Sequence, residues 1–228
     1  ESKRLWMHIK PAVYWNRTFD RFEYFRGTTK PVPYNYHLTN VFGARLNFYF
    51  DSSIGRTAFG AAYRNEDIVS GNLGEPLANP KHISNTDRDY THGLNRSDIS
   101  FHLEHNVLLK DFTLSAGFVL LKNTWNKRHF GFYPGIDASY RLGEHFKFFA
   151  SWNTSLRTPS FTEMYYNVGG HIPNPLLNPE ELSAIEGGMK YTARGIYGSV
   201  SVYHNRYKNM IDWIADDTGE KRAWRSVN

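Results

Sequence analysis

Apolar and polar side chains alternate along most of this chain with the period of two that a β-strand imposes. The clearest example is residues 34–51, where apolar and polar positions fall on opposite faces of the predicted strand. The apolar set there is Tyr36, Leu38, Phe42, Ala44, Leu46, Phe48 and Phe50. Similar patterns predict strands at residues 5–17, 56–70, 95–109, 112–121, 130–142, 145–157, 182–193 and 196–214. Nine strands are therefore expected, residues 223–228 look like the start of a tenth, and no long helix is predicted.

The connections between these strands alternate in length. Long connections centre on residues 25, 83, 126, 168 and 218, and short ones centre on residues 53, 111, 144 and 195. In an antiparallel meander, this order places every long loop at one end of the sheet and every short turn at the other. Bacterial outer-membrane barrels have this asymmetry, whereas strands of soluble sandwiches are shorter, about five or six residues. The pattern favours an all-β antiparallel meander within a transmembrane β-barrel, and a soluble β-rich binding domain is the alternative.

Proline and glycine mark the interruptions of the strand pattern. Pro11 lies inside the first predicted strand and indicates either an edge strand or a bulge. Residues 16–33 and 71–94 are rich in turn-forming or charged residues and are predicted to be loops. Residues 158–179 contain four prolines, which lack a backbone donor, so this stretch is expected to leave the sheet.

Composition narrows the possible classes of function. Aromatic residues make up 16% of the chain, which fits β structure at a boundary between apolar and aqueous surroundings. No apolar run is long enough for a membrane helix, but hydropathy does not detect barrel strands whose faces alternate. Cysteine is absent, which excludes disulfides and thiolate metal sites. The net charge of +5 is spread along the chain, so no nucleic-acid partner is predicted.

Charged side chains on the polar face of the predicted strands form the first set of candidate site residues. On a barrel wall they would face the lumen, where they either pair with one another or contact a plug domain. This set is Arg45, Arg64, Glu66, Asp98, Glu104, Asp137, Arg141, Arg157 and Glu186. The face opposite them is expected to carry Leu46, Phe48, Phe101, Leu114, Phe132 and Phe148.

Aromatic and histidine side chains in the long connections form the second set. Rigid rings provide contact area at low entropic cost, so they suit the binding of a ligand at the mouth of a barrel. The alternative is that they belong to an aromatic girdle or to the packing of the loops. The candidates are Tyr24, Phe25, Tyr90, His92, Trp125, Tyr165, Tyr166 and His171.

The sequence contains little that indicates catalysis or metal binding. The ten histidines include no pair at the helical spacing of a zinc protease, so neither a metal nor a cofactor is predicted. No phosphate loop, dinucleotide fingerprint or nucleophile elbow is present. A barrel enzyme such as a protease or phospholipase is an alternative function. Its catalytic group would have to come from Asp87 and Asp89 with His82 or His92. No catalytic residue is assigned, and the chain is not expected to be an enzyme.

Three motifs resemble the barrel domain of TonB-dependent outer-membrane receptors. They are RTPSFTEMY at residues 157–165, NPLLNPE at residues 174–180, and EGGMKY at residues 186–191. The resemblance extends to residues 34–37, 60–68, 70–74 and 203–211, which are similar to receptors of this family from Bacteroidetes-type bacteria.

The resemblance has implications for fold, location and partners. It implies a barrel of about 22 strands in the outer membrane of a Gram-negative bacterium. An N-terminal plug would fill this barrel, and an inner-membrane TonB complex would drive transport. The cargo would be a large scarce nutrient such as cobalamin or a ferric siderophore, and the other partners would be the plug, the TonB complex and membrane lipid. Residues 1–228 are expected to be an internal part of the barrel domain, with the plug and remaining strands outside this sequence.

Overall fold

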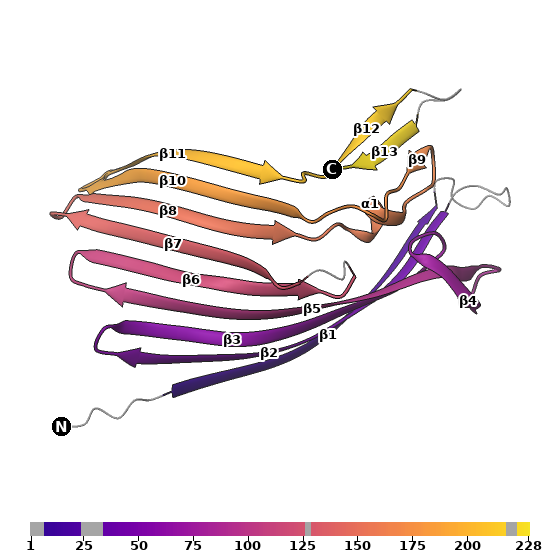
Figure 1. Cartoon of the computed structure of the whole chain (residues 1–228), viewed down its shortest axis with the longest axis horizontal. Helices are drawn as coiled ribbons and strands as arrows, with labels where there is room; N and C mark the ends of the chain where they lie inside the picture. Colours follow the sequence, from indigo (N-terminus) through magenta and orange to yellow (C-terminus); the bar gives the residue numbers. More distant parts are fainter. Residues whose placement is uncertain (1–6, 24–33, 126–128, 218–222) are drawn as a thin grey trace.

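A curved antiparallel sheet, in which each long strand pairs with the next, dominates the structure (Figure 1). This computed structural model describes residues 7–23, 34–125, 129–217 and 223–228. The strand order is β1–β2–β3–β5–β6–β7–β8–β10–β11. The nine strands of this path confirm the predicted all-β meander. Within the described ranges, no helix is long and apolar enough to cross a membrane.

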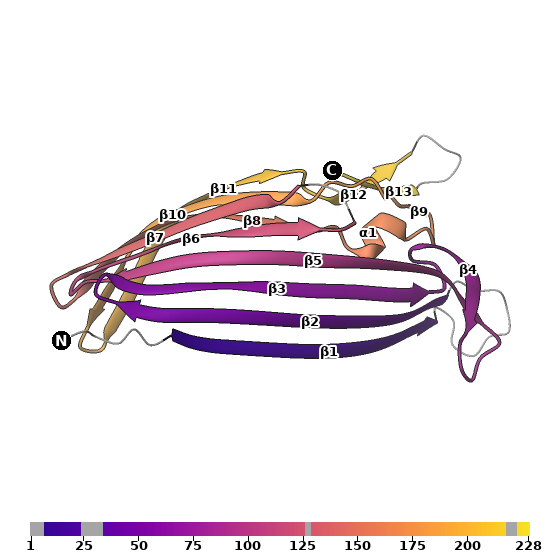
Figure 2. The ribbon, with the colours of Figure 1, turned by 60° about the horizontal axis from the view of Figure 1, so that its bottom comes forward.

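The strands are long, from 12 residues in β6 to 20 in β5. Figure 2 shows β1, β2, β3 and β5 running side by side over nearly their whole length. The strands of the meander are β1 (Met7–Glu23), β2 (Tyr34–Ser52), β3 (Gly55–Ser70), β5 (Asp89–Leu108), β6 (Phe112–Asn123), β7 (Gly131–Leu142), β8 (Phe146–Arg157), β10 (Glu180–Ala193) and β11 (Ile196–Lys208). A short strand, β4 (Glu75–His82), pairs with β5 off this path.

The predicted apolar positions share one side of the sheet, the apolar face. Directly opposed residues of antiparallel neighbours point to the same side. Leu46 on β2 opposes Ala61, Ala61 opposes Phe101 on β5, Phe101 opposes Leu120, and Leu120 opposes Phe132 on β7. Alternation along the strands places Phe48, Leu114 and Phe148 on this same face. Phe132 is 58% exposed, so this face presents large apolar side chains at the surface.

The predicted charged positions lie on the other side, the polar face. Across the sheet, Ser115 opposes Asp137, Asp137 opposes Ser151, and Ser151 opposes Glu186. Alternation along the strands also places these residues on the polar face: Arg45, Arg64, Glu66, Asp98, Glu104, Arg141 and Arg157. A register slip of one residue would have mixed the apolar and charged sets. The predicted separation of the two faces is therefore confirmed.

Short turns and long connections lie at opposite ends of the sheet, as expected (Figure 1). The short turns join β2 to β3, β5 to β6, β7 to β8, and β10 to β11. Two of them contain Gly143 and Gly195, whose φ angles of 65° and 74° lie in the left-handed region that favours glycine. The long-connection end carries β4, the helix α1 (Phe161–Tyr165), and a second sheet of β9 (His171–Ile172), β12 (Asp212–Asp216) and β13 (Ala223–Val227).

Two predicted loops are partly strand. β1 extends to Glu23, so residues 16–23 continue the sheet instead of forming a loop. The register passes through Pro11 without a bulge, and among the described strands β1 pairs only with β2, so the missing N–H of Pro11 interrupts no ladder there. The predicted loop at residues 71–94 contains β4 and the first residues of β5. Cross-strand pairing with neighbours, which local alternation does not reveal, extends these strands.

The last predicted strand, residues 196–214, is broken in the structure. β11 ends at Lys208, and Asn209 follows with a φ of 54°, outside the range of a regular strand. Residues 212–216 form β12, which pairs with β13, and β13 pairs in parallel with β9. Residues 223–227 are thus a strand of this second sheet, and do not extend the main meander.

Buried apolar side chains concentrate at the long-connection end. One cluster there consists of Tyr36, Val69, Ile83 and Tyr90. A second cluster, called the loop core here, contains Met164, Leu177 and Ile211, with Leu94, Trp125, Phe161 and Tyr165 packed against it. The long connections therefore have an apolar core of their own, which fixes their arrangement over the end of the sheet.

Candidate functional site

The connection between β8 and β10 begins with a capped helical turn. Ser160 is the N-cap of α1, and its hydroxyl accepts a hydrogen bond from the Glu163 N–H at 3.2 Å. The Glu163 carboxylate accepts one in return from the Ser160 N–H at 2.7 Å. This reciprocal capping box satisfies two backbone donors that α1 would otherwise leave unpaired. It explains why a short helix starts directly after Pro159.

Arg157, at the end of β8, forms ion pairs with α1 and with the start of β10. Its guanidinium donates to both oxygens of Glu163, at 3.0 and 3.1 Å, and its Nε donates to Glu180 at 2.5 Å. Glu180 also accepts a hydrogen bond from the Ile211 N–H at 2.6 Å. Partial burial acts to raise the pKa of Glu163, but the hydrogen bonds from Arg157 and Ser160 outweigh it and lower that pKa. We call Arg157, Glu163 and Glu180 the Arg157 cluster.

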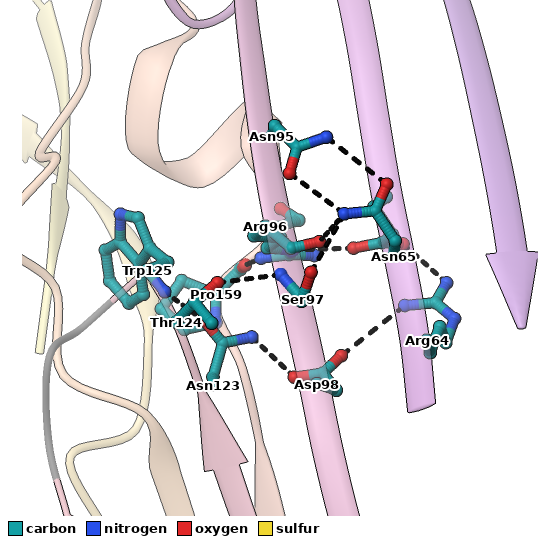
Figure 3. A network of polar contacts seen from close by, with 12 residues as sticks. Arg64, Asn65, Asn95, Arg96, Ser97, Asp98, Asn123, Thr124, Trp125 and Pro159 are labelled. Atoms are coloured by element: carbon teal, nitrogen blue, oxygen red, sulfur yellow. Dashed lines mark hydrogen bonds and ion pairs between the residues drawn. The ribbon is translucent and has the colours of Figure 1, made fainter. Parts of the chain in front are cut away.

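A second polar network holds the same connection from the side of β5 (Figure 3). Arg96 is buried and donates to Glu66 at 2.6 Å and to the carbonyl oxygen of Pro159 at 2.6 Å. Its guanidinium lies 4.3 Å from the centre of the Phe161 ring. Arg64 pairs with the same Glu66 at 2.5 Å and with Asp98 at 3.7 Å. The β8–β10 connection is therefore anchored both to β10 and to the β3–β5 pair.

Three rings meet farther along this connection. Tyr166 and His171 are edge to face with centroids 5.2 Å apart, and His171 and Trp213 are edge to face at 5.0 Å. The Tyr166 hydroxyl accepts a hydrogen bond from the Asn35 side chain at 3.3 Å. All three rings are partly exposed. We call Tyr166, His171 and Trp213 the ring cluster, and it combines residues from the β8–β10 connection, β9 and β12.

The other predicted aromatic candidates have different surroundings. Tyr90 lies in β5, not in a loop, and is only 5% exposed within the first buried cluster. Trp125 and Tyr165 pack against the loop core, and burial together with Glu75 raises the pKa of Tyr165 to about 12. His92 lies in β5, where its ring contacts the Thr91 hydroxyl at 2.8 Å. The last two candidates, Tyr24 and Phe25, lie outside the described residues.

The predicted polar-face residues also differ in their partners. Arg64, Glu66, Asp98 and Arg157 take part in the two ionic networks. Glu104 accepts hydrogen bonds from Asn106 and Ser115, and Asp137 accepts one from Asn153. Arg45, Arg141 and Glu186 lie on the same face. The structure thus gives some of these residues a role in anchoring the long connection.

Several residues of this region were not predicted from the sequence. Arg96, Glu163, Glu180 and Trp213 were absent from the candidate sets, although they hold the connection or complete the ring cluster. Ser160 and Glu163 have the spacing of a capping box, so this part could have been found in the sequence. Nothing local in the sequence links Arg96 to Pro159, because 63 positions separate them.

The residues considered for catalysis are spread over the β4–β5 region. His82 and Asp89 approach to 3.3 Å, and their side chains are 66% and 49% exposed. Asp87 is 96% exposed and lies 3.9 Å from Arg88. No group of three or more histidine, cysteine, aspartate or glutamate side chains in the described part of the chain is placed to hold a metal ion.

A meander of long strands with one apolar and one polar face, and with long connections gathered at one end, defines the class as a barrel wall. The sequence profile described as TonB dependent receptor-like, beta-barrel, matches residues 5–228. The chain therefore belongs to this family of β-barrels.

Individual relatives agree with this assignment. The chain is 26% identical over 174 residues to the vitamin B12 transporter BtuB of Vibrio vulnificus (strain YJ016). This match covers 75% of this chain and 25% of BtuB. It is similar to the copper transporter OprC, with a TM-score of 0.72, 14% identity, and coverage of 96% of this chain and 38% of OprC. A mutant of the ferric enterobactin receptor PfeA from Pseudomonas aeruginosa is similar with a TM-score of 0.64 and 14% identity. The match covers 98% of this chain and 36% of the PfeA chain. At such identities the solved structures show the fold alone, and the chain spans about a quarter of BtuB's length.

Proposed function

We propose that this chain is part of the wall of an outer-membrane receptor that imports a large, scarce nutrient with energy from a TonB complex. The observation that carries the proposal is the division of the sheet into an apolar and a polar face, with all long connections at one end. In this proposal the apolar face contacts lipid of the Gram-negative outer membrane and the polar face lines the lumen. The full-length receptor would add the remaining strands and an N-terminal plug domain, which would occupy that lumen.

The proposed cargo is a bulky, partly apolar metal chelate, either cobalamin or a ferric siderophore. The sequence relative is named as a vitamin B12 transporter, and two similar structures are named as receptors for ferric enterobactin and for siderophores. The long-connection end offers the partly exposed ring cluster, and aromatic contacts with a few polar groups suit either class of ligand. Because Tyr90, Trp125 and Tyr165 pack into apolar clusters, we assign ligand contact to Tyr166, His171 and Trp213.

Titration calorimetry of the detergent-solubilised full-length receptor tests this proposal. We expect cyanocobalamin or one of a panel of ferric siderophores to bind at micromolar concentration or tighter. Replacing Tyr166, His171 and Trp213 together with alanine should weaken this binding at least about tenfold, or about 1.4 kcal/mol. The matched control replaces Tyr140 and Tyr203, exposed residues of β7 and β11 away from the long-connection end, and should leave the affinity unchanged. Failure of every ligand to bind would contradict the proposed cargo class.

A further inference from the structure

Ser70, at the end of β3, closes a tight turn with its side chain. Its hydroxyl accepts hydrogen bonds from the N–H groups of Asn72 at 3.0 Å and Leu73 at 2.8 Å. Ser70 is fully buried and Leu73 is 4% exposed, so water does not compete for these contacts. The hydroxyl therefore fixes the first residues of the connection between β3 and β4.

His37 lies on β2 directly opposite Ser70 and faces this hydroxyl. Its Nδ1 lies 2.7 Å from the Ser70 oxygen, whereas the side-chain oxygen of Asn72 lies 3.4 Å from it. A hydroxyl has two acceptor lone pairs and one proton, and the two backbone N–H groups occupy both lone pairs. The hydroxyl proton is therefore donated to the nearer acceptor, His37 Nδ1, so that nitrogen is unprotonated. In this arrangement His37 is neutral and has its proton on Nε2.

The surroundings of His37 favour the same neutral form. Desolvation lowers the pKa of this half-buried histidine and outweighs the opposing effect of Asp20, which is directly opposite on β1. His92 on β5 is the titratable group that faces Ser70 from the other side. His37 lies outside the membrane-spanning part of β2, because spanning takes about 9–11 residues, fewer than separate it from Ser52 at the short turn.

Two side-chain amides connect this turn to the ring cluster. The Asn72 amide donates to the Asn35 side-chain oxygen at 2.6 Å, and Asn35 in turn donates to the Tyr166 hydroxyl at 3.3 Å. A proton on His37 Nδ1 would point an N–H group at a Ser70 oxygen that has no lone pair left for it. Either the imidazole or the Ser70 turn must then move, and movement of the turn displaces the support of Tyr166.

We propose that neutral His37 is a positioning residue of the ring cluster, and that its protonation in acid loosens residues 71–73 and releases Tyr166. Because the folded-state pKa of His37 lies below the ordinary value of about 6.5, its stabilising contribution is complete above pH 6.5. That contribution falls as the pH drops below 6.5 toward the folded-state value. The consequence for binding rests on the proposed function, since a ligand held by the ring cluster should bind more weakly in acid.

Hydrogen exchange and fluorine NMR of the ligand-free, detergent-solubilised full-length receptor test the inference. After correction for intrinsic exchange rates, the protection of the Asn72 and Leu73 amides should fall at least about fivefold between pH 7.5 and pH 5.0. A 3-fluorotyrosine in place of Tyr166 should report the same transition as a shift of its resonance. His37→Asn keeps an oxygen acceptor near the place of Nδ1 but does not titrate. In that variant the loss of protection should vanish, and the fluorine shift should shrink to the part caused by His171, which contacts the Tyr166 ring.

Two further variants make the result specific. Asn35→Ala removes the amide between the turn and Tyr166, so it should keep the pH-dependent protection of residues 72 and 73 and lose the His37 part of the fluorine shift. His105→Asn is the matched control, because Nδ1 of His105 lies 2.9 Å from the Thr57 hydroxyl near the short turns. This control should behave as the wild type in both measurements.

The outcomes separate this inference from the proposed function. Equal protection at the two pH values in the wild type, or an equal loss in the wild type and His37→Asn, would overturn it. So would a fluorine shift that is the same in these two proteins. Cyanocobalamin and ferric enterobactin are then titrated at both pH values, and the wild-type affinity for whichever binds should fall at least about threefold more than that of His37→Asn. A receptor that shows the pH-dependent protection and fluorine shift but binds neither compound would contradict the proposed cargo alone.

Discussion

At the scale of single residues, Arg157 connects the barrel strands to the long connections. Glu163 and Glu180 are mostly buried, with side chains 17% and 16% exposed, and Arg157 forms an ion pair with each of them. Through Glu180 the same contact reaches the Ile211 N–H, so the segment between β11 and β12 and the β8–β10 connection share one anchoring point. This arrangement gives a physical reason for the Arg-Thr-Pro-Ser-Phe-x-Glu spacing, because the arginine and the glutamate must meet across the turn at Pro159.

Replacing this arginine should release α1 from the sheet. Arg157→Ala removes charge-assisted hydrogen bonds to two carboxylates, and we expect a local loss of about 2 kcal/mol after allowance for the partly exposed guanidinium. Hydrogen exchange of residues 161–165 should then accelerate roughly 30-fold. Arg141→Ala is the control, since Arg141 lies on the same face and has no ion pair with a described residue. Equal protection of α1 in the wild type and Arg157→Ala would contradict this role.

At the scale of elements, the β8–β10 connection is a folded unit held by complementary charge and an apolar core. The Arg157 cluster anchors its start, Arg96 holds Pro159, and the loop core packs Met164 and Leu177 against Ile211. Short irregular segments rarely keep a fixed arrangement without such contacts. The partly exposed ring cluster is therefore carried by an element whose position is determined on several sides.

This element should loosen in acid. Because the folded-state pKa of Glu163 is lowered, its stabilising contribution is present above the unfolded pKa of about 4.3. That contribution is lost as the pH falls through the lower folded-state value. We expect the fluorescence of Trp125, which packs on the loop core, to change between about pH 5 and pH 3. The Trp125 signal is obtained by subtracting the fluorescence of the Trp125→Phe variant from that of the wild type. Glu163→Gln should lack this component of the transition, and an unchanged pH profile in that variant would assign the transition to another group.

At the scale of the whole molecule, the two faces of the sheet have different surroundings in the proposed receptor. Many large side chains of the apolar face are exposed, and an apolar surface of this extent normally contacts a partner or a membrane. The polar face carries charged side chains instead, and the Arg64, Arg96 and Arg157 networks lie at its long-connection end. In the proposed receptor, lipid on the apolar side and the plug domain on the polar side account for both faces.

A charge placed on each face in turn should distinguish their surroundings. Ile136→Arg, on the apolar face near the middle of β7, should destabilise the full-length receptor in phospholipid vesicles by roughly 2–4 kcal/mol. Ser151→Arg, on the polar face between Asp137 and Glu186, should cost much less. Urea unfolding followed by tryptophan fluorescence measures both variants. Similar destabilisation by the two arginines would contradict a lipid-facing apolar face.

The sequence by itself determined the nine strands of the meander, their two faces and the ends at which the connections lie. Alternation such as that of Leu46 and Phe48 against Arg45 is a local property, since successive side chains of a strand must point to opposite sides. Tertiary structure alone decided the anchoring and the core of the long connections. Arg96 meets Pro159, His171 meets Trp213, and Tyr90 becomes buried through contacts between distant segments. These segments have no period, so the partner of each side chain depends on how the connections pack over the end of the sheet.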